Sequence, residues 1–231
     1  MTHKILAIDT SSEACSVALS NGSDNIHRYT DEPRKHAEMV LPMVEELLAE
    51  MELPLTGLDA IAFGRGPGAF TGLRIAAGMV QGLAFGADLP VIPVSSLAVL
   101  AHRSWREFGF TQVHAAFDAR MGEVYWGSYV VAEDGQARLM GVECVCKPEE
   151  VAAAAGITAQ SGWNGVGSGW CYQKLLEIGT GPLQQCEPSL LPHSLDLLAL
   201  GQAGFSAGNL IAAEQVAPVY LRNDVAAKPN K

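Results

Sequence analysis

Cysteine is scarce in this sequence, and a long hydrophobic run is missing from it. The five cysteines are odd in number and form no C-x-x-C pair, which is typical of neither a disulfide framework nor a zinc cluster. The most apolar region, residues 75–101, is interrupted by Gln81, Asp88 and Pro93, so it lacks the run of about 20 apolar residues that crosses a membrane. The apolar run that ends at Asp9 is too short for the apolar part of a signal peptide. These absences predict a cytoplasmic protein with reduced thiols and no membrane partner.

Positive charge is also in short supply. The chain has 15 Lys and Arg against 25 Asp and Glu, which gives a formal net charge of −10. Nucleic acid is held largely by Lys and Arg that displace counterions from phosphates, so we do not expect this chain alone to bind it well. With 231 residues and 48% hydrophobic content, the chain can form one large domain or two small ones around a sizeable core.

The first half of the sequence alternates strand patterns with helical patterns. KILAIDT and CSVALSNG predict a β-hairpin, and NIHRYT predicts a third strand. Apolar residues recur at helical spacing from His36 to Met51, which predicts an amphipathic helix with Pro42 as a bend. The segment DAIAFGRGPG then predicts a buried strand that enters a glycine loop, and residues 71–86 a second helix with Thr71 as its N-cap.

The second half repeats this order. VHAAFDARMGEVYWGSYVV places Asp118 at the end of an apolar strand and returns on an alternating strand. A helix pattern at 149–155 follows, and WNGVGSGWCYQKLL is a second glycine loop that enters a helix. The repeat predicts two related lobes, residues 1–104 and 105–194. We expect the last segment, 195–231, to return to the first lobe as a helix and a tail.

The first glycine loop, GRGPGAFTGLR at residues 64–74, has two interpretations. It cradles a phosphate at the start of a helix, or it only turns the chain where a positive φ is needed. Neither glycine loop ends in the G-K-[ST] of a P-loop, and no acidic ribose partner follows the first, so both familiar nucleotide motifs are excluded. Asp9 and Asp118 likewise either position Mg²⁺ and water in an ATPase or close their hairpin turns.

The combination of an aspartate at a strand end, a hairpin and a glycine loop, present twice, resembles the actin-like superfamily of kinases and ATPases. Within it, the sequence resembles the TsaB (YeaZ) family in a series of blocks that span residues 5–222. The matching blocks are ILAIDTSSEACSVAL, HAEMVLPMVEELL, GRGPGAFTGLRIAAGMVQGLA, PVIPVSSLAVLA, DARMGEVYWGSY and APVYLR. The resemblance implies an α/β fold of two tandem actin-like (RNase H-like) lobes, a degenerate form of the ASKHA-type fold.

The same resemblance implies a function. TsaB proteins are the non-catalytic partners of the TsaD-type transferase, which makes threonylcarbamoyladenosine next to the anticodon of tRNA. The implied partners are a TsaD-type subunit, a small TsaE-type ATPase, a second copy when the chain is free, and tRNA only through the complex. The resemblance makes no cofactor certain and leaves open ATP or ADP at a subunit interface, with Asp9, Ser11, Gly66 and Asp118 as contacts. The alternative is an independent small-molecule kinase or ATPase of the same superfamily.

The sequence departs from the catalytic relative at its metal site. TsaD-type enzymes carry two metal-binding histidines four residues apart after the glycine-loop helix, where this sequence has Ser96 and Leu100. A serine and a leucine do not replace two imidazole ligands, and the six histidines include no i, i+4 pair. A G-x-S-x-G nucleophile motif is also missing. The sequence therefore predicts no metal site and no catalytic residue.

Three glycines at i, i+4 and i+8 of the second predicted helix would form one face without side chains. Each glycine lowers helix stability by up to about 1 kcal/mol relative to alanine, so we expect a close contact that compensates for this loss. That contact is internal, with the 36–51 helix or the sheet, or external, with a partner. The resemblance favours an external one, because TsaB proteins pair through two helices of the first lobe. It implies an interface of Val40, Met43, Leu47, Arg74, Gly78, Gly82 and Gly86.

Overall fold

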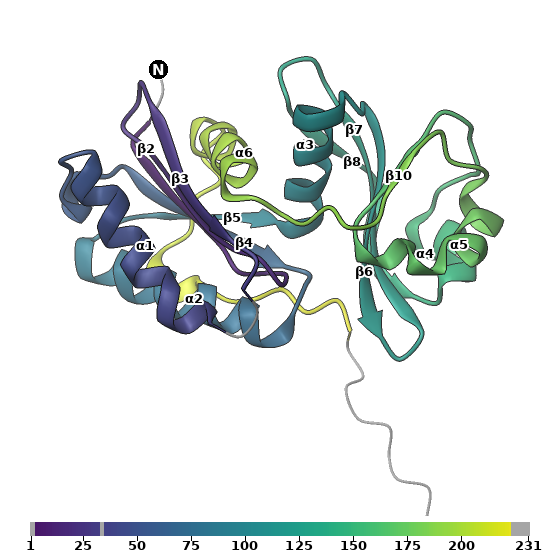
Figure 1. Cartoon of the computed structure of the whole chain (residues 1–231), viewed down its shortest axis with the longest axis horizontal. Helices are drawn as coiled ribbons and strands as arrows, with labels where there is room; N and C mark the ends of the chain where they lie inside the picture. The colour runs from purple at the N-terminus through teal and green to yellow at the C-terminus, as the bar shows by residue number, and fades with distance from the viewer. Residues whose placement is uncertain (1–2, 33–34, 223–231) are drawn as a thin grey trace, which may run out of the picture.

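The computed structural model describes residues 3–32 and 35–222. This part of the chain forms two five-stranded sheets with helices packed against them, which gives two lobes side by side (Figure 1). The strand order is β3-β2-β1-β4-β5 in the first sheet and β10-β9-β6-β7-β8 in the second. The α/β class predicted from the sequence is therefore confirmed. Among these residues, no helix has both the length and the hydropathy to cross a membrane.

The first sheet follows the predicted hairpin and third strand. β1 pairs antiparallel with β2 and parallel with β4, so that Leu6 lies opposite both Leu19 and Ile61. Alternate residues of these strands face two separate cores. Leu6 packs with α1 and α2 on one face, and Ile5 packs with α6 on the other. The elements are β1 (Ile5–Asp9), β2 (Cys15–Ser20), β3 (Asn25–Thr30), α1 (His36–Glu50), β4 (Ala60–Gly66), α2 (Phe70–Ala87), β5 (Val91–Ser95) and α6 (Ser194–Ser206).

The second sheet repeats the pattern of a hairpin followed by a parallel strand. β6 pairs antiparallel with β7 and parallel with β9. α3 covers one face through Leu97 and Leu100, while α4 and α5 cover the other through Val151 and Leu176. The elements are α3 (Ser96–Phe108), β6 (Gln112–Arg120), β7 (Glu123–Val131), β8 (Ala137–Cys146), α4 (Val151–Ala155), β9 (Asn164–Val166), α5 (Gln173–Thr180) and β10 (Cys186–Glu187). Short 3₁₀ turns, η1 (Leu55–Gly57), η2 (Pro148–Glu150), η3 (Ser168–Tyr172) and η4 (Ala213–Gln215), complete the described elements.

Two details differ from the sequence predictions. The expected lobe boundary at residue 104 falls inside α3, which packs Leu97 and Leu100 in the second lobe and Val99 against the first. The N-cap of α2 is Ala69 rather than Thr71, because the helix begins one residue before Thr71. The predicted helix from His36 is present as α1, which contains Pro42 and continues to Glu50.

The end of the described chain returns to the first lobe. α6 packs on the first sheet through Leu197 and Leu198, and the Val219 backbone N–H donates to the Arg65 carbonyl at 2.8 Å. Residues 223–231 of the expected tail lie outside the described residues.

A buried charge cluster joins the two lobes where α3 meets α6. The Asp196 carboxylate, on α6, accepts two hydrogen bonds of 2.8 Å from Arg106 and lies 2.7 Å from His102 Nδ1. Burial opposes the ionisation of Asp196, but the hydrogen bonds from Arg106 and His102 outweigh it and hold the pKa of Asp196 below its ordinary value. Because α3 packs on the second sheet and α6 on the first, this cluster fixes one lobe against the other.

Candidate functional site

The glycine loop packs tightly against the first hairpin turn. The Ala69 N–H donates to the Ser11 carbonyl at 2.7 Å, and the Thr10 hydroxyl donates to the Gly72 carbonyl at 2.7 Å. A Cβ atom at Gly68 would collide with the Ser11 carbonyl oxygen, and one at Gly72 with the Thr10 carbonyl oxygen. These glycines therefore let the start of α2 approach the hairpin backbone.

Asp9 lies beneath this turn rather than in an open cleft. Its side chain is buried, and one carboxylate oxygen accepts from the Ser11 N–H at 3.0 Å and the Ser11 hydroxyl at 2.9 Å. The other oxygen, Oδ2, has no hydrogen-bond partner among the described residues, and a Cβ at Gly64 would collide with it. Burial raises the pKa of Asp9 above its ordinary value, against the hydrogen bonds from Ser11.

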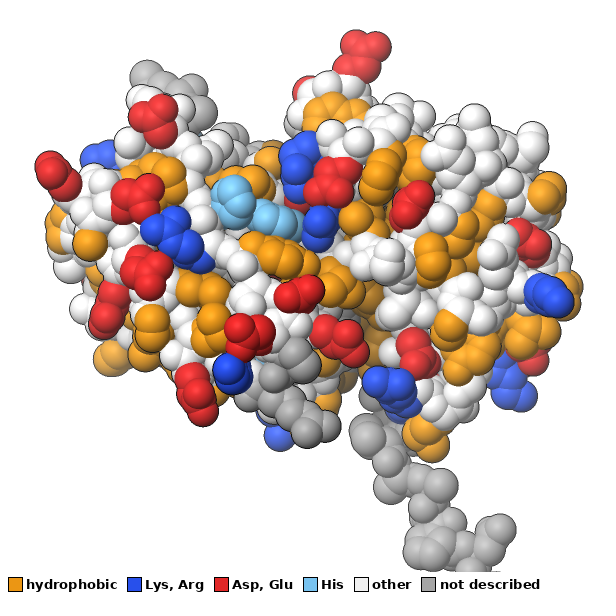
Figure 2. Space-filling view, viewed as in Figure 1, with side chains coloured by type: hydrophobic (Ala, Val, Ile, Leu, Met, Phe, Trp, Pro, Cys, Tyr) orange, Lys and Arg blue, Asp and Glu red, His pale blue; other side chains and the backbone are white. Residues whose placement is uncertain are grey.

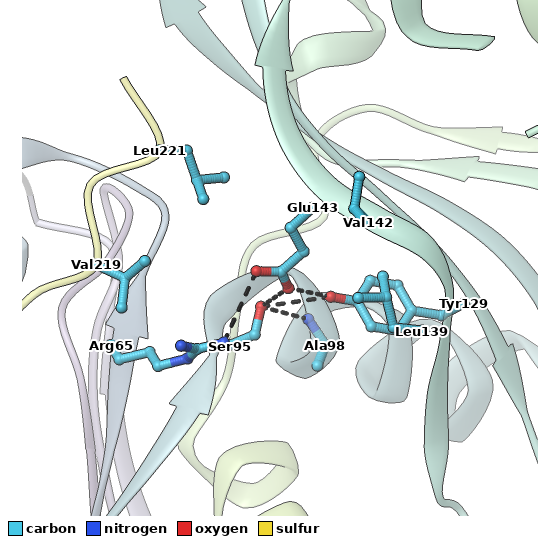
Figure 3. A pocket seen from close by; sticks show the side chains of 9 residues that line it. All are labelled: Arg65, Ser95, Ala98, Tyr129, Leu139, Val142, Glu143, Val219 and Leu221. Carbon is cyan, nitrogen blue, oxygen red and sulfur yellow. Dashed lines mark hydrogen bonds and ion pairs between the residues drawn. The ribbon is translucent and has the colours of Figure 1, made fainter. Parts of the chain in front are cut away.

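Gly66 and Asp118 are the other two predicted nucleotide contacts. The Gly66 N–H donates to the Ser96 hydroxyl at 3.2 Å. Asp118 lies in the second lobe, where its carboxylate is 3.2 Å from the Arg120 guanidinium. None of the four predicted contacts lines the cavity between the lobes that Figure 3 shows. Gly66 thus lies beside Ser96 and Asp118 lies in the other lobe, while the glycine loop packs on the hairpin turn that contains Ser11.

The two residues that stand where TsaD-type enzymes carry metal-binding histidines lie in the protein interior. Ser96 and Leu100 are both buried in α3, Ser96 as the acceptor for Gly66 and Leu100 in the second core. Across residues 3–32 and 35–222, no group of three or more His, Cys, Asp or Glu side chains is placed to hold a metal ion.

The three glycines of α2 face away from the lobe. Gly78, Gly82 and Gly86 are exposed, and a Cβ atom built at any of them has no neighbour within 4 Å. The internal alternative, close packing against α1 or the sheet, is wrong. Phe70 and Arg74 continue the same i, i+4 stripe towards the start of α2, and Phe85 flanks it. We call this exposed surface the glycine face: Phe70, Arg74, Gly78, Gly82, Phe85 and Gly86.

Large aromatic side chains border the glycines. Phe70 is 55% exposed and Phe85 is 71% exposed. The Arg74 guanidinium lies 3.9 Å above the Phe70 ring, and its Nε donates to the Tyr220 hydroxyl at 3.1 Å. The sequence predictions missed both phenylalanines, although the i, i+4 spacing of Phe70 from Arg74 was visible.

The prediction that three residues of α1 belong to the partner interface is wrong. Val40, Met43 and Leu47 are at most 7% exposed and belong to the first core. Their helical spacing places them on the face of α1 that packs against the sheet, so their side chains do not reach a partner. Leu41, on the opposite side of α1, is 39% exposed.

Comparison with known proteins identifies the family. The family model described as "TsaD: tRNA N6-adenosine threonylcarbamoyltransferase" matches residues 30–167. An Escherichia coli (strain K12) protein named "tRNA threonylcarbamoyladenosine biosynthesis protein TsaB" is 46% identical over 227 residues, which cover 97% of each chain. This chain belongs to the TsaB family.

Two further TsaB (YeaZ) proteins agree over nearly the full length. A TsaB protein of Haemophilus influenzae is 42% identical, with 96% of this chain and 94% of the relative covered. The solved structure of YeaZ from Pseudomonas aeruginosa is 50% identical, with a TM-score of 0.87 over 95% of this chain and 100% of that one. The predicted fold of two tandem actin-like (RNase H-like) lobes is confirmed.

Proposed function

We propose that this chain is the non-catalytic scaffold and activator subunit of a cytoplasmic complex that makes threonylcarbamoyladenosine on tRNA. Its TsaB relatives are named for that biosynthesis. In this proposal the chain binds a TsaD-type catalytic subunit, and a small TsaE-type ATPase joins the pair. The free chain forms a homodimer through the same surface, and tRNA is bound only within the complex.

The glycine face is the observation that carries this proposal. A glycine inside a helix costs up to about 1 kcal/mol relative to alanine, and no contact within the described residues compensates for Gly78, Gly82 or Gly86. A facing helix that packs against these positions approaches the α2 backbone more closely than side chains would allow. Phe70 and Phe85 flank the contact with apolar area of the kind that anchors protein interfaces.

The charge distribution supports a role in which partners contribute most of the tRNA binding. Figure 2 shows acidic side chains spread over the visible face of both lobes, with Lys and Arg scattered among them. A net charge of −10 opposes the binding of a phosphate backbone, which depends on Lys and Arg.

The second candidate, an independent kinase or ATPase, is less well supported. It needs Asp9 to hold Mg²⁺ and water, but Asp9 is buried beneath the glycine loop and its pKa is raised by burial. ATP turnover by the purified chain alone tests this candidate directly. Turnover that is lost in Asp9→Asn would favour it over the scaffold.

The scaffold proposal is tested by co-purification with a TsaD-type subunit. Gly78→Leu and Gly82→Leu should each abolish the pairing, because a leucine pushes a facing helix beyond packing distance. Lys174→Leu, a change at another exposed position, on α5 of the second lobe, is the control and should pair normally. Circular dichroism checks that each variant is folded. Folded glycine variants that pair like the parent chain would remove the glycine face from the interface.

A further inference from the structure

A cavity of about 420 Å³ lies where the two lobes meet (Figure 3). Its volume falls within the range of about 300–1,000 Å³ that is usual for small-molecule sites. Residues from four separate parts of the chain converge on it: the end of β4, the β5–α3 junction, strands β7 and β8, and the segment that follows η4. None of the residues assigned above to the glycine face belongs to it.

One end of the cavity is polar and carries one charge of each sign. The Glu143 side chain is 10% exposed, and its Oε1 accepts hydrogen bonds from the hydroxyls of Ser95 and Tyr129. Burial, together with the neighbouring Glu143 carboxylate, raises the pKa of Tyr129 well above its ordinary value, so this hydroxyl remains a donor. The position of the carboxylate is thus fixed by two donors.

The second oxygen of Glu143 and the Arg65 guanidinium are left without direct hydrogen bonds. The Arg65 nitrogen lies 3.9 Å from Glu143 Oε2, beyond hydrogen-bond distance. Within the described residues, no other group donates to Oε2 and none accepts from the Arg65 side chain. The Arg65 backbone is held by strand β4 and by the Val219 N–H. The two groups therefore form a long ion pair, in which the Glu143 oxygen and the Arg65 nitrogens keep unused hydrogen-bonding capacity (Figure 3).

The remaining walls of the cavity are aliphatic. Val142 and Leu139 of β8 line it from the second lobe, at 54% and 38% exposed, and Val219 and Leu221 line it from the opposite side (Figure 3). Exposed aliphatic side chains of this size gain free energy when an apolar group covers them. The cavity thus combines paired opposite charges with an apolar surface beside them.

We propose that this cavity binds a small zwitterion, a free α-amino acid with an aliphatic side chain. Its ammonium group donates to Glu143 Oε2, and its carboxylate accepts from the Arg65 guanidinium. Its side chain covers Leu139, Val142 and Leu221. Ligands with only one of the two charges form a charge-assisted hydrogen bond with either Glu143 or Arg65 but not with both, so they gain less binding free energy than a zwitterion. This inference does not depend on the proposed scaffold function.

Isothermal titration calorimetry of the full chain tests the proposal, with L-leucine and L-valine as probes. We expect saturable binding at millimolar concentrations. The single-charge analogues 3-methylbutylamine and 4-methylpentanoate should not bind detectably. Saturable heat missing for both amino acids, or equal binding of either analogue, would overturn the proposal.

Two charge variants locate the site. Glu143→Gln and Arg65→Gln should each weaken L-leucine binding by about tenfold or more, since each removes a charge-assisted hydrogen bond. The matched controls Glu149→Gln and Arg138→Gln change exposed residues outside the cavity and should bind like the parent chain. Leu221→Ala leaves both charges in place and should weaken L-leucine more than L-alanine. Folded charge variants that bind L-leucine like the parent chain would place the amino acid elsewhere.

Discussion

Replacing Gly78 and Gly82 by alanine should stabilise the folded chain while it weakens binding to a partner. At both positions a Cβ atom meets nothing within 4 Å, so alanine adds no clash in the free chain. An interior helix position gains up to about 1 kcal/mol when alanine replaces glycine. The double variant should therefore be about 2 kcal/mol more stable, which for a chain of this length raises the melting temperature by about 4–8 °C.

The same substitution in the first turn of the same helix should have the opposite sign. At Gly72 the added Cβ would collide with the Thr10 carbonyl oxygen, which is backbone and moves little. Overpacking of this kind costs about 1–3 kcal/mol. Gly72→Ala is therefore the control for the single variants Gly78→Ala and Gly82→Ala, because it makes the same substitution in the same helix where the new methyl group meets backbone.

Thermal unfolding followed by circular dichroism measures the change in melting temperature. It is repeated over a range of chain concentrations, so that the effect of dimerisation is separated from monomer stability. Titration with a TsaD-type subunit measures the binding term. A double variant that melts lower than the parent chain would mean that Gly78 and Gly82 serve packing within the lobe. Higher stability with unchanged partner affinity would refute the assignment of these glycines to an interface.

Leu47→Ala should lower the free energy of unfolding, measured by urea denaturation, by about 2–5 kcal/mol, because Leu47 is fully buried. A loss under about 1 kcal/mol, together with abolished pairing, would show instead that Leu47 is an interface residue. Burial lowers the pKa of His114 from 6.5 to about 3, so the imidazole binds a proton more readily in the unfolded chain than in the folded one. The stability that neutral His114 contributes is therefore complete above pH 6.5 and is lost as the pH falls towards 3. Urea titrations should show about 2 kcal/mol of this loss between pH 7 and pH 5, and His114→Gln should remove it; an unchanged pH dependence would contradict the burial argument. Elemental analysis of the purified chain should find no stoichiometric zinc or iron. About one tightly held ion per chain would contradict the interpretation that Ser96 and Leu100 leave the chain without a metal site.

Local patterns in the sequence predicted the elements well, because apolar residues that face the core recur with the period of a strand or a helix. Leu6 and Ile8 alternate with residues of the opposite core in β1, and Val40, Val44 and Leu47 recur at helical spacing in α1. The same spacing also marks those α1 residues as buried. Assigning Val40 and Leu47 to an interface gave the family resemblance more weight than this pattern.

The errors concern contacts between segments far apart in the sequence. Nothing near Asp9 indicates that Gly64 will cover it, or that Gly68 and Gly72 will pack on the turn that follows it, because these contacts join residues about sixty positions apart. The pattern of α3 shows an apolar face but does not say which sheet it covers. Glu143 was missed for the same reason, since only the fold brings β8 beside Ser95 and Arg65.

The placement of α6 affects the order in which the two lobes are completed during synthesis. One face of the first sheet, with Ile5, Ala62 and Ile92, is covered by Leu197 and Leu198 of α6. Those residues leave the ribosome after every strand of the second sheet. The second lobe, whose strands and covering helices all lie between residues 96 and 187, is thus complete in the nascent chain before the first. The lobe that is made first closes last, and until then its uncovered strand face is the part of the newly made chain most in need of a chaperone.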